Sequence, residues 1–349
     1  MTSTQLKMAD LYARLAAIGF PKRFIQQKIL PDWWNDEVDT APGVLAEGAL
    51  YISRRLNLDV RSLLTTDAHP IFESTCQPKF KLKGGTDQQQ LTIPRELSAR
   101  VSELVSYACQ RPYQGLDGLS VLNIREQILQ NRDAVDLQGF LGFCWQRGIP
   151  VIHFAEFPPG VHKFHGMVAY FYHRPVILIS LKDCSLARLL FIAAHELGHI
   201  LKGHINQEGL LVDEAIELES NDEEELEANQ VAAELLIGKS GISYDLWHKF
   251  LSGEQLAAKA RDLGTRDGVN PGVVALNIAW NRARRAESQS DKGMMWATAK
   301  KALKILEPDA NAPQVINRTL VQNLDWEKLG DDNQDYLATM LSLQFDAAG

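Results

Sequence analysis

Hydrophobic and polar residues follow two different periods along this chain, and the change from one to the other marks its organisation. Up to residue 146, apolar positions recur every three or four residues, which predicts helices. Residues 79–92 break this spacing with Gly84-Gly85 and three glutamines, which is typical of a linker. The predicted helices of this half cover residues 5–65, 94–109, 124–130 and 137–145.

From residue 150 the pattern becomes that of β-strands. Residues 150–154 form a short apolar run, and two β-branched or aromatic runs follow at 167–172 and 176–179, which predicts a hairpin. A long helix is expected at 185–203 and another at 222–237. Everything beyond Ser240 has helical spacing, so the strands occupy only the middle of the chain.

These patterns predict four regions. Residues 1–78 form an N-terminal helical region, and 79–92 a linker. A mixed core follows at 93–240, and a C-terminal helical region at 241–349. The fold class is therefore α+β and mostly helical, with one small β-sheet.

Composition narrows the class of protein. The 349 residues carry a net charge of −8, which argues against a nucleic-acid-binding protein as a whole, although a basic patch on one region stays open. The four cysteines are far apart and form no CxxC pair, as expected in a reducing compartment. The first residues are polar, and no uninterrupted apolar run reaches membrane-spanning length. We therefore expect a cytoplasmic protein.

The long central helix carries the clearest chemical motif, His195-Glu196-Leu197-Gly198-His199. Residues four apart on a helix lie about 40° apart around its axis, so the two imidazoles converge on one point. Neutral imidazoles are good zinc ligands, and a catalytic zinc site keeps one position for water. In such motifs the glutamate is the general base. The pentapeptide predicts one catalytic Zn²⁺ per chain, with Glu196 as the base.

The third ligand must come from elsewhere. Metzincins place Gly and His three and six residues after the second histidine, but Lys202 and Ile205 stand there instead. His204 would point about 140° away from His199 on a continued helix, so we interpret it as a helix-end residue. A carboxylate on the helix 222–237 is the better candidate. Helical phase alone leaves both Glu224 and Glu227 open.

Three stretches of the chain resemble the ImmA/IrrE family of metallopeptidases. They are the apolar hairpin ending at Ile179, the motif helix from Ala194 to Leu201, and the segment 226–236, which reads Leu-Glu-Ala-Asn-Gln-Val-Ala-Ala-Glu-Leu-Leu. The last of these is similar to the family's Glu-Ala-Asn-x-Phe-Ala-Ala-x-Leu-Leu pattern, with Val231 in place of phenylalanine. The resemblance covers roughly residues 150–240 and extends to about 285.

The resemblance implies a gluzincin-like zinc endopeptidase with a zincin-like core, in which the sheet packs on the HExxH helix. It implies that Glu227 is the third zinc ligand, beside His195 and His199. Known members cleave a helix-turn-helix repressor or antitoxin and so switch on a stress, phage-defence or mobile-element response. The N-terminal helices of this chain show no basic recognition face of their own. The alternatives are a regulatory protein that binds a partner or DNA and uses the zinc core mainly as a sensor, and a zinc-stabilised scaffold without turnover.

Two further expectations concern the substrate. The hairpin carries Tyr170, Tyr172, His173 and Arg174, which are candidates to contact the substrate or the transition state. An extended substrate is expected to add a strand to the edge of that hairpin. The stretch 206–227 contains ten acidic and no basic residues, and it either attracts a basic substrate or forms a solvated loop.

Overall fold

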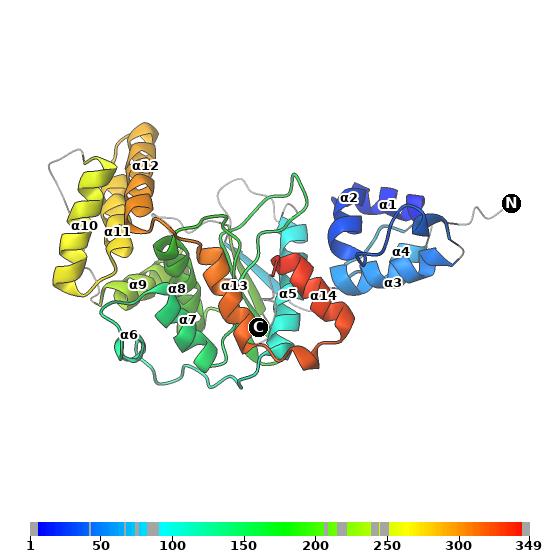
Figure 1. Cartoon of the computed structure of the whole chain (residues 1–349), viewed down its shortest axis with the longest axis horizontal. Coiled ribbons are helices and arrows are strands. Elements are labelled where there is room, and N and C mark those ends of the chain that lie inside the picture. Colours follow the sequence, from blue (N-terminus) through cyan, green and yellow to red (C-terminus); the bar gives the residue numbers. More distant parts are fainter. Residues whose placement is uncertain are drawn as a thin grey trace.

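In the computed structural model, the chain is an elongated molecule of three parts, with a mixed α/β body between two groups of helices (Figure 1). The structure describes residues 6–41, 43–65, 68–73, 77–81, 91–205, 209–214, 222–238, 244 and 251–343. Among these residues, no helix combines the length and apolarity needed to cross a bilayer.

The N-terminal part is a small group of helices at one end of the molecule (Figure 1). Its helices pack around an apolar core, and a partly buried aspartate links two of its segments: the hydroxyl of Tyr12 and the indole N–H of Trp34 both donate to Asp39, each at 2.8 Å. Trp34 is buried while its neighbour Trp33 is half exposed. The elements are α1 (Met8–Ala17), α2 (Lys22–Phe24), a π-helical turn (Ile25–Ile29), a 3₁₀ turn (Val38–Thr40), α3 (Val44–Leu56) and α4 (Val60–Leu64).

A five-stranded mixed sheet forms the centre of the molecule. Its order is β1-β5-β3-β4-β2, in which β3 is antiparallel to both β4 and β5, while the two outer pairs are parallel. The predicted hairpin is confirmed as β3 and β4, joined by a two-residue turn. The strands are β1 (Gln77–Lys81), β2 (Val151–His153), β3 (Gly166–Phe171), β4 (Arg174–Ile179) and β5 (Gly209–Asp213).

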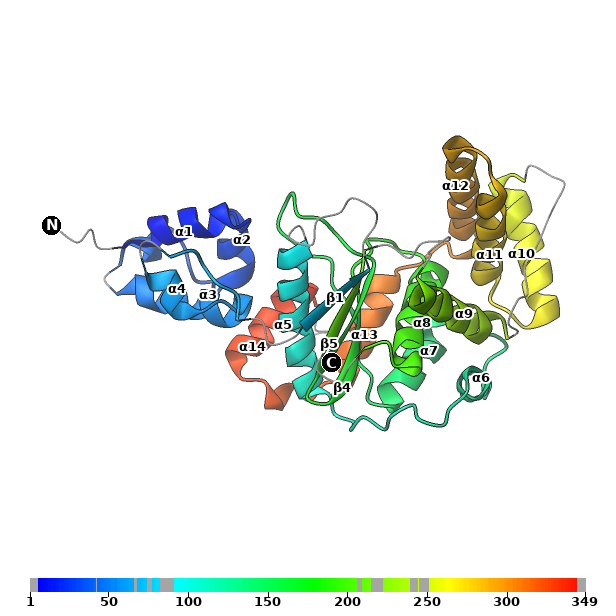
Figure 2. The same cartoon turned by 180° about the vertical axis from the view of Figure 1, so that it is seen from behind.

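Helices cover both faces of this sheet. Helix α5 (Thr92–Ala108) lies on one face and α8 (Leu186–Lys202) on the other, as the views from opposite sides show (Figure 2). Helix α9 (Glu223–Ile237) packs closely on α8. A Cβ on Gly198 would lie 2.9 Å from the Cα of Ala228, so this glycine sets how near the two helices come. Helices α6 (Val121–Leu129) and α7 (Leu137–Gln146) complete this side.

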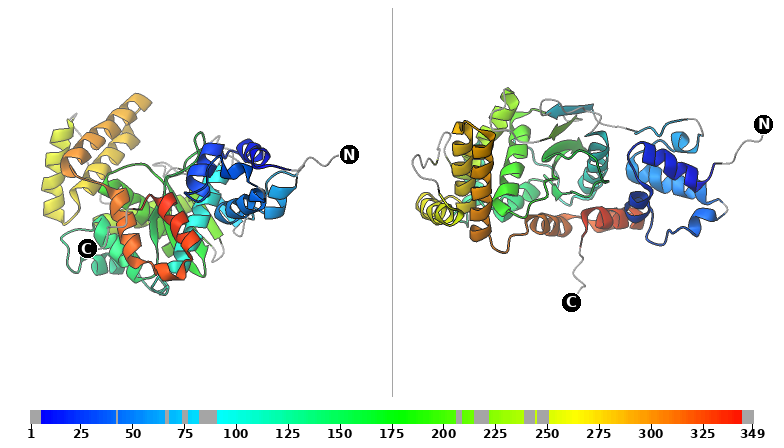
Figure 3. Two further views of the ribbon diagram at one scale, coloured as in Figure 1. Left: turned by 45° about the vertical axis from the view of Figure 1, so that its right-hand side comes forward. Right: turned by 90° about the horizontal axis from the view of Figure 1, so that it is seen from above.

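The C-terminal helical region divides into two parts (Figure 3). Helices α10, α11 and α12 form a bundle at the far end of the molecule, and α13 and α14 return to the central body. The side chain of Asn317 on α13 bonds the backbone N–H and C=O of His153, each at 3.0 Å, which ties this helix to β2. The helices are α10 (Gly253–Asp267), α11 (Pro271–Arg285), α12 (Gln289–Leu306), α13 (Ala312–Asn323) and α14 (Asp331–Leu341), with a 3₁₀ turn at Trp326–Lys328.

The α+β, mostly helical class is confirmed, with the sheet packed on the motif helix. The predicted linker 79–92 is wrong at its start, because residues 79–81 belong to β1 and pair with β5. That pairing joins segments more than a hundred residues apart, so no local pattern indicates it. Residues 82–90 lie outside the described part of the chain, and the other predicted region boundaries stay predictions.

Candidate metal centre

The motif helix α8 is held firmly at its beginning. Ser185 is its N-cap, and the carboxylate of Glu307, at the end of α12, accepts hydrogen bonds from the Ser185 hydroxyl and from the N–H groups of Leu186 and Ala187, at 2.8–3.0 Å. Orphan N–H groups and the helix dipole both favour an anion at this position. The end of α12, in the C-terminal helical region, therefore fixes the start of the motif helix.

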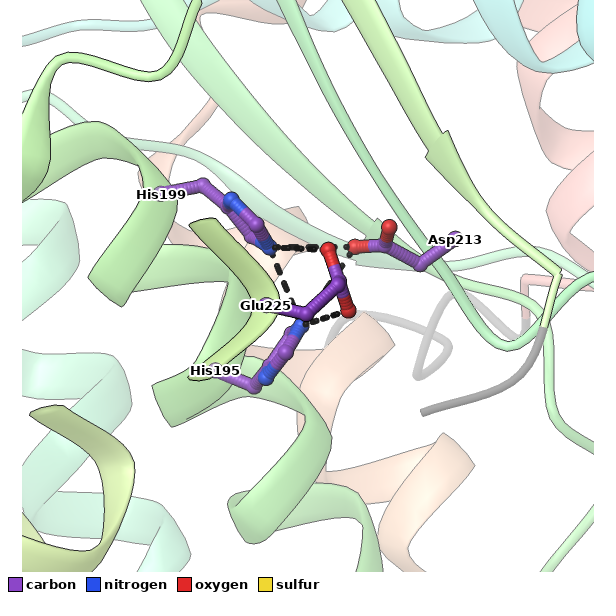
Figure 4. A group of neighbouring side chains, drawn as sticks. All are labelled: His195, His199, Asp213 and Glu225. Atoms are coloured by element: carbon purple, nitrogen blue, oxygen red, sulfur yellow. Dashed lines mark hydrogen bonds and ion pairs between the residues drawn. The ribbon is translucent and has the colours of Figure 1, made fainter. Parts of the chain in front are cut away.

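Four side chains from three elements converge beside this helix (Figure 4). His195 and His199 come from α8, Asp213 from the end of β5, and Glu225 from the first turn of α9, and all four are buried. The two Nε2 atoms lie 3.0 Å apart. Asp213 Oδ2 lies 3.5 and 3.4 Å from them, and the Glu225 oxygens lie 3.4 and 3.3 Å away.

These separations fit the edges of a coordination tetrahedron. Ligand atoms at about 2.0–2.1 Å from a tetrahedral zinc ion are separated by about 3.3 Å. Five separations in the cluster lie between 3.0 and 3.5 Å, with Glu225 facing each histidine through a different oxygen. Two imidazoles and two carboxylates are also a donor set that a divalent transition metal accepts. The cluster therefore has the size and the chemistry of a metal site.

The charge of the cluster supports the same assignment. Glu196, Asp213 and Glu225 place three carboxyl groups in one buried space, and both oxygens of Glu196 and of Asp213 have no hydrogen-bond partner among the described residues. Burial lowers the pKa of His195, but the carboxylates of Asp213 and Glu225 raise it to about 9. Buried carboxylates are costly unless a cation compensates them, so this pocket favours a bound cation.

A second ring of side chains orients the two imidazoles. Asn229 Oδ1 lies 3.1 Å from His195 Nδ1, which assigns the proton to Nδ1 and leaves Nε2 free to bind metal. His199 Nδ1 lies 2.8 Å from His204 Nδ1, and His204 Nε2 lies 2.9 Å from Glu227. If His199 binds through Nε2, its Nδ1–H donates to His204, whose own Nε2–H donates to Glu227. Hydrogen-bonded partners of this kind fix the tautomer of metal-binding histidines.

Glu196 faces the sheet from the same turn of α8. A Cβ on Gly166, the first residue of β3, would lie only 1.8 Å from its Oε1, so β3 can pass the carboxylate only because residue 166 is glycine. Burial, together with the nearby charges of Asp213 and Glu225, raises the pKa of Glu196 well above its usual range. A carboxyl group with a raised pKa is suited to accept and return a proton near neutral pH.

The structure corrects the predicted third ligand. Glu227 is half exposed and pairs with His204, and Glu224 pairs with Lys79 at 2.5 Å, so neither reaches the cluster. Glu225 lies there instead. Two residues span about 200° of a helix, so Glu225 and Glu227 lie on opposite sides of α9. His204, interpreted from sequence as a simple helix-end residue, bridges Glu227 to His199.

The sequence does not identify Asp213 as a candidate ligand, because only the fold brings β5 beside α8. Its signal was faint: an aspartate that ends the apolar run Leu210-Leu211-Val212 inside the acidic stretch. The remainder of that stretch, residues 206–208 and 215–221, lies outside the described residues.

Tyr172, His173 and Arg174 do not reach the cluster, and the role predicted for Tyr170 stays a prediction. Tyr172 and His173 form the β3–β4 turn, with φ of 51° and 59°, roughly 20 Å along the strand from Gly166. Arg174 donates to the backbone carbonyls of Arg111 and Gly148, which is a structural role. Tyr170 is partly buried, and burial raises its pKa. The predicted free edge is also wrong over most of its length, because β5 pairs with β3 and β2 pairs with β4.

A mixed sheet packed on an HExxH helix, with a second helix that brings a glutamate to the two histidines, is an arrangement typical of zincin-like metallopeptidases. Residues 147–274 match the model of a peptidase family described as the IrrE N-terminal-like domain. The chain therefore contains a domain of this peptidase family, and the resemblance to ImmA/IrrE proteins is confirmed. Neither the curated proteins nor the solved structures provide a match to the chain.

Proposed function

We propose that this protein is a zinc-dependent endopeptidase. The observation that carries the proposal is the position of Glu196: a fully buried carboxylate, without a hydrogen-bond partner in the described structure, directly beside a cluster that has metal-ligand geometry. A purely structural metal site has no use for a base in this place. The matching peptidase family supports hydrolysis as the reaction.

The residues of the chain divide the chemistry among them. His195, His199 and Glu225 would hold the ion, oriented by Asn229 and His204. When bound, a Zn²⁺ ion would polarise the peptide carbonyl and lower the pKa of a neighbouring water to roughly 7. The Glu196 carboxylate would take a proton from that water during attack and return it to the leaving amine. Zinc suits two imidazoles and carboxylate oxygen in a tetrahedral arrangement.

The substrate class comes from the family resemblance, with support from charge. We propose a helix-turn-helix repressor or antitoxin, cleaved in the cytoplasm to start a stress, phage-defence or mobile-element response. The first turn of α9 carries Glu223 and Glu224, and Glu227 follows on its exposed side. Such an acidic rim near the cluster favours a basic substrate, and DNA-binding proteins are basic.

One observation favours a second candidate function. Asp213 gives the cluster four side-chain ligands, and four protein ligands are typical of structural rather than catalytic zinc sites. A regulatory protein that binds a partner or DNA and uses its zinc core as a sensor would need no free coordination position. The two functions differ in one respect: only the peptidase requires Glu196.

The test is Glu196→Gln, with Glu287→Gln, an exposed glutamate that lies outside the cluster and the acidic rim, as the matched control. The assay incubates full-length zinc-loaded protein with purified helix-turn-helix regulators from the same organism, and detects new N-termini by mass spectrometry. We expect cleavage by the native chain and by the control, and at least a 100-fold slower reaction in Glu196→Gln, with one zinc per chain in all three. Undiminished cleavage by Glu196→Gln would exclude the mechanism.

A further inference from the structure

Strand β5 passes along the part of β3 that lies beside the catalytic glutamate. It is antiparallel to β3, and Asp213 stands opposite Gly166, the residue whose Cα faces Glu196. The N–H of His165, just before β3, donates to the carbonyl of Asp213 at 2.9 Å. An extended peptide that added a strand to β3 would make this same kind of contact. Strand β5 therefore lies where a substrate strand is expected.

The carboxylate at the end of β5 reaches the metal cluster. Asp213 Oδ2 is 3.5 Å from His195 Nε2 and 3.4 Å from His199 Nε2, close to the separations of Glu225 from the same atoms. Asp213 is fully buried, and neither of its oxygens has a hydrogen-bond partner among the described residues. A catalytic zinc site needs one position for water, and Asp213 would fill it.

We propose that β5 is a built-in pseudosubstrate: it blocks β3, and its Asp213 closes the metal site as a fourth protein ligand. The inference rests on the proposed peptidase function and adds how that activity is controlled. Cleavage then requires β5 to leave β3, which frees both the strand edge and the coordination position. Binding of the correct substrate or of an activator would shift the protein toward this open form.

The surroundings of β5 are consistent with a segment that is docked. Leu210, Leu211 and Val212 are buried, and β1 pairs with the other side of the strand. Just beyond Asp213, the carboxylate of Glu214 lies 2.7 Å from Nε2 of His162. These contacts stabilise the closed form, in which β5 pairs with β3, so that no separate inhibitor protein is needed. The proposal therefore predicts a narrow specificity, because a weakly binding peptide cannot displace the strand.

The first experiment replaces the ligand. Full-length protein is loaded with Co²⁺, whose visible absorption reports coordination, and titrated with acetohydroxamate as a small metal-binding probe. In Asp213→Ala we expect one Co²⁺ per chain, a changed spectrum, at least tenfold tighter acetohydroxamate binding and at least tenfold faster cleavage. The exposed Glu287→Gln should match the native protein. An unchanged spectrum and probe affinity would show that Asp213 is not a ligand. Loss of the metal would show that Asp213 is a permanent structural ligand, and either result overturns the proposal.

A second experiment tests the movement of β5 without touching the cluster. Ala169 and Leu210 face each other across the β3–β5 pair, and antiparallel partners have Cα separations of about 4.5–5.5 Å, within the range of a disulfide. In Ala169→Cys/Leu210→Cys, oxidation should abolish cleavage and acetohydroxamate binding, and reduction should restore both. Ala169→Cys alone is the control. Equal activity in the oxidised and reduced forms would overturn the proposal.

The two proposals fail in different ways. If Asp213→Ala changes the Co²⁺ spectrum and the probe affinity as expected but no variant cleaves any substrate, the closed site stands and the peptidase function is refuted.

Discussion

Replacing Gly166 by alanine, which adds a single methyl group, should push the proposed base Glu196 away from the metal cluster. Gly166→Ala places a Cβ 1.8 Å from Oε1 of Glu196 and 2.6 Å from its Cδ. Ordinary contact begins at 3.4 Å, so the carboxylate must move by about 1.6 Å, the difference between 3.4 and 1.8 Å. Because Glu196 is fully buried, this movement is opposed by packing on every side.

The size of the effect follows from this displacement. A misplacement of about 1 Å in a reacting group typically costs about 100-fold in rate. General-base catalysis contributes about 100- to 10,000-fold in total. We therefore expect the cleavage rate of Gly166→Ala to fall at least 100-fold. Overpacking should also lower the free energy of unfolding by about 1–3 kcal/mol. The zinc content should stay at one per chain, because the nearest contacts of the new Cβ are atoms of Glu196 and not of a ligand.

The assay measures the cleavage rate, zinc content and urea unfolding of the same preparation. The matched control is Gly142→Ala on α7, where an added Cβ meets nothing within 4 Å. This control should keep the native rate and gain slightly in stability, as a helical alanine does. A Gly166→Ala protein with the native rate and stability would refute the placement of Glu196 against β3.

Three further predictions concern the surroundings of the site. Asn229→Leu should weaken zinc binding about 10- to 100-fold, measured by competition with a chromophoric chelator, because the proton on His195 Nδ1 loses its acceptor. Glu307→Ala should lower the free energy of unfolding in urea by about 1–3 kcal/mol, because the N–H groups that open α8 lose their shared acceptor; the exposed Glu287→Ala should leave it unchanged. Removal of zinc by chelation should lower the melting temperature, since an ion at 100 times its Kd adds about 2.7 kcal/mol; an unaltered melting temperature would argue against a bound metal.

Local patterns in the sequence were sufficient for part of this site. The spacing of His195 and His199 places both imidazoles on one face of a helix whatever the rest of the chain does. The β3–β4 hairpin and the helices on either side of it also follow from short-range periodicity. These features depend on neighbours within a few residues, which is why they could be predicted.

The positions of Glu225 and Asp213, the other two candidate ligands, depend on how distant segments pack. Helix α9 turns Ala228 toward Gly198 of α8, and this contact brings Glu225 to the metal cluster and leaves Glu227 outside. The sequence pattern was misleading here, because Leu226 on this helix is about half exposed. Asp213 requires the pairing of β5 with β3, which joins residues more than 40 positions apart. Neither arrangement has a local signature.

The most direct test of the account is a crystal structure of the zinc-loaded protein with anomalous diffraction data collected at the zinc absorption edge. The account predicts one anomalous peak per chain, about 2.0–2.2 Å from Nε2 of His195, Nε2 of His199 and a carboxylate oxygen of Glu225, with Asp213 as the fourth ligand. A zinc peak bound by Glu227 instead of Glu225, or the absence of any peak at these residues in protein that analyses as zinc-loaded, would contradict it.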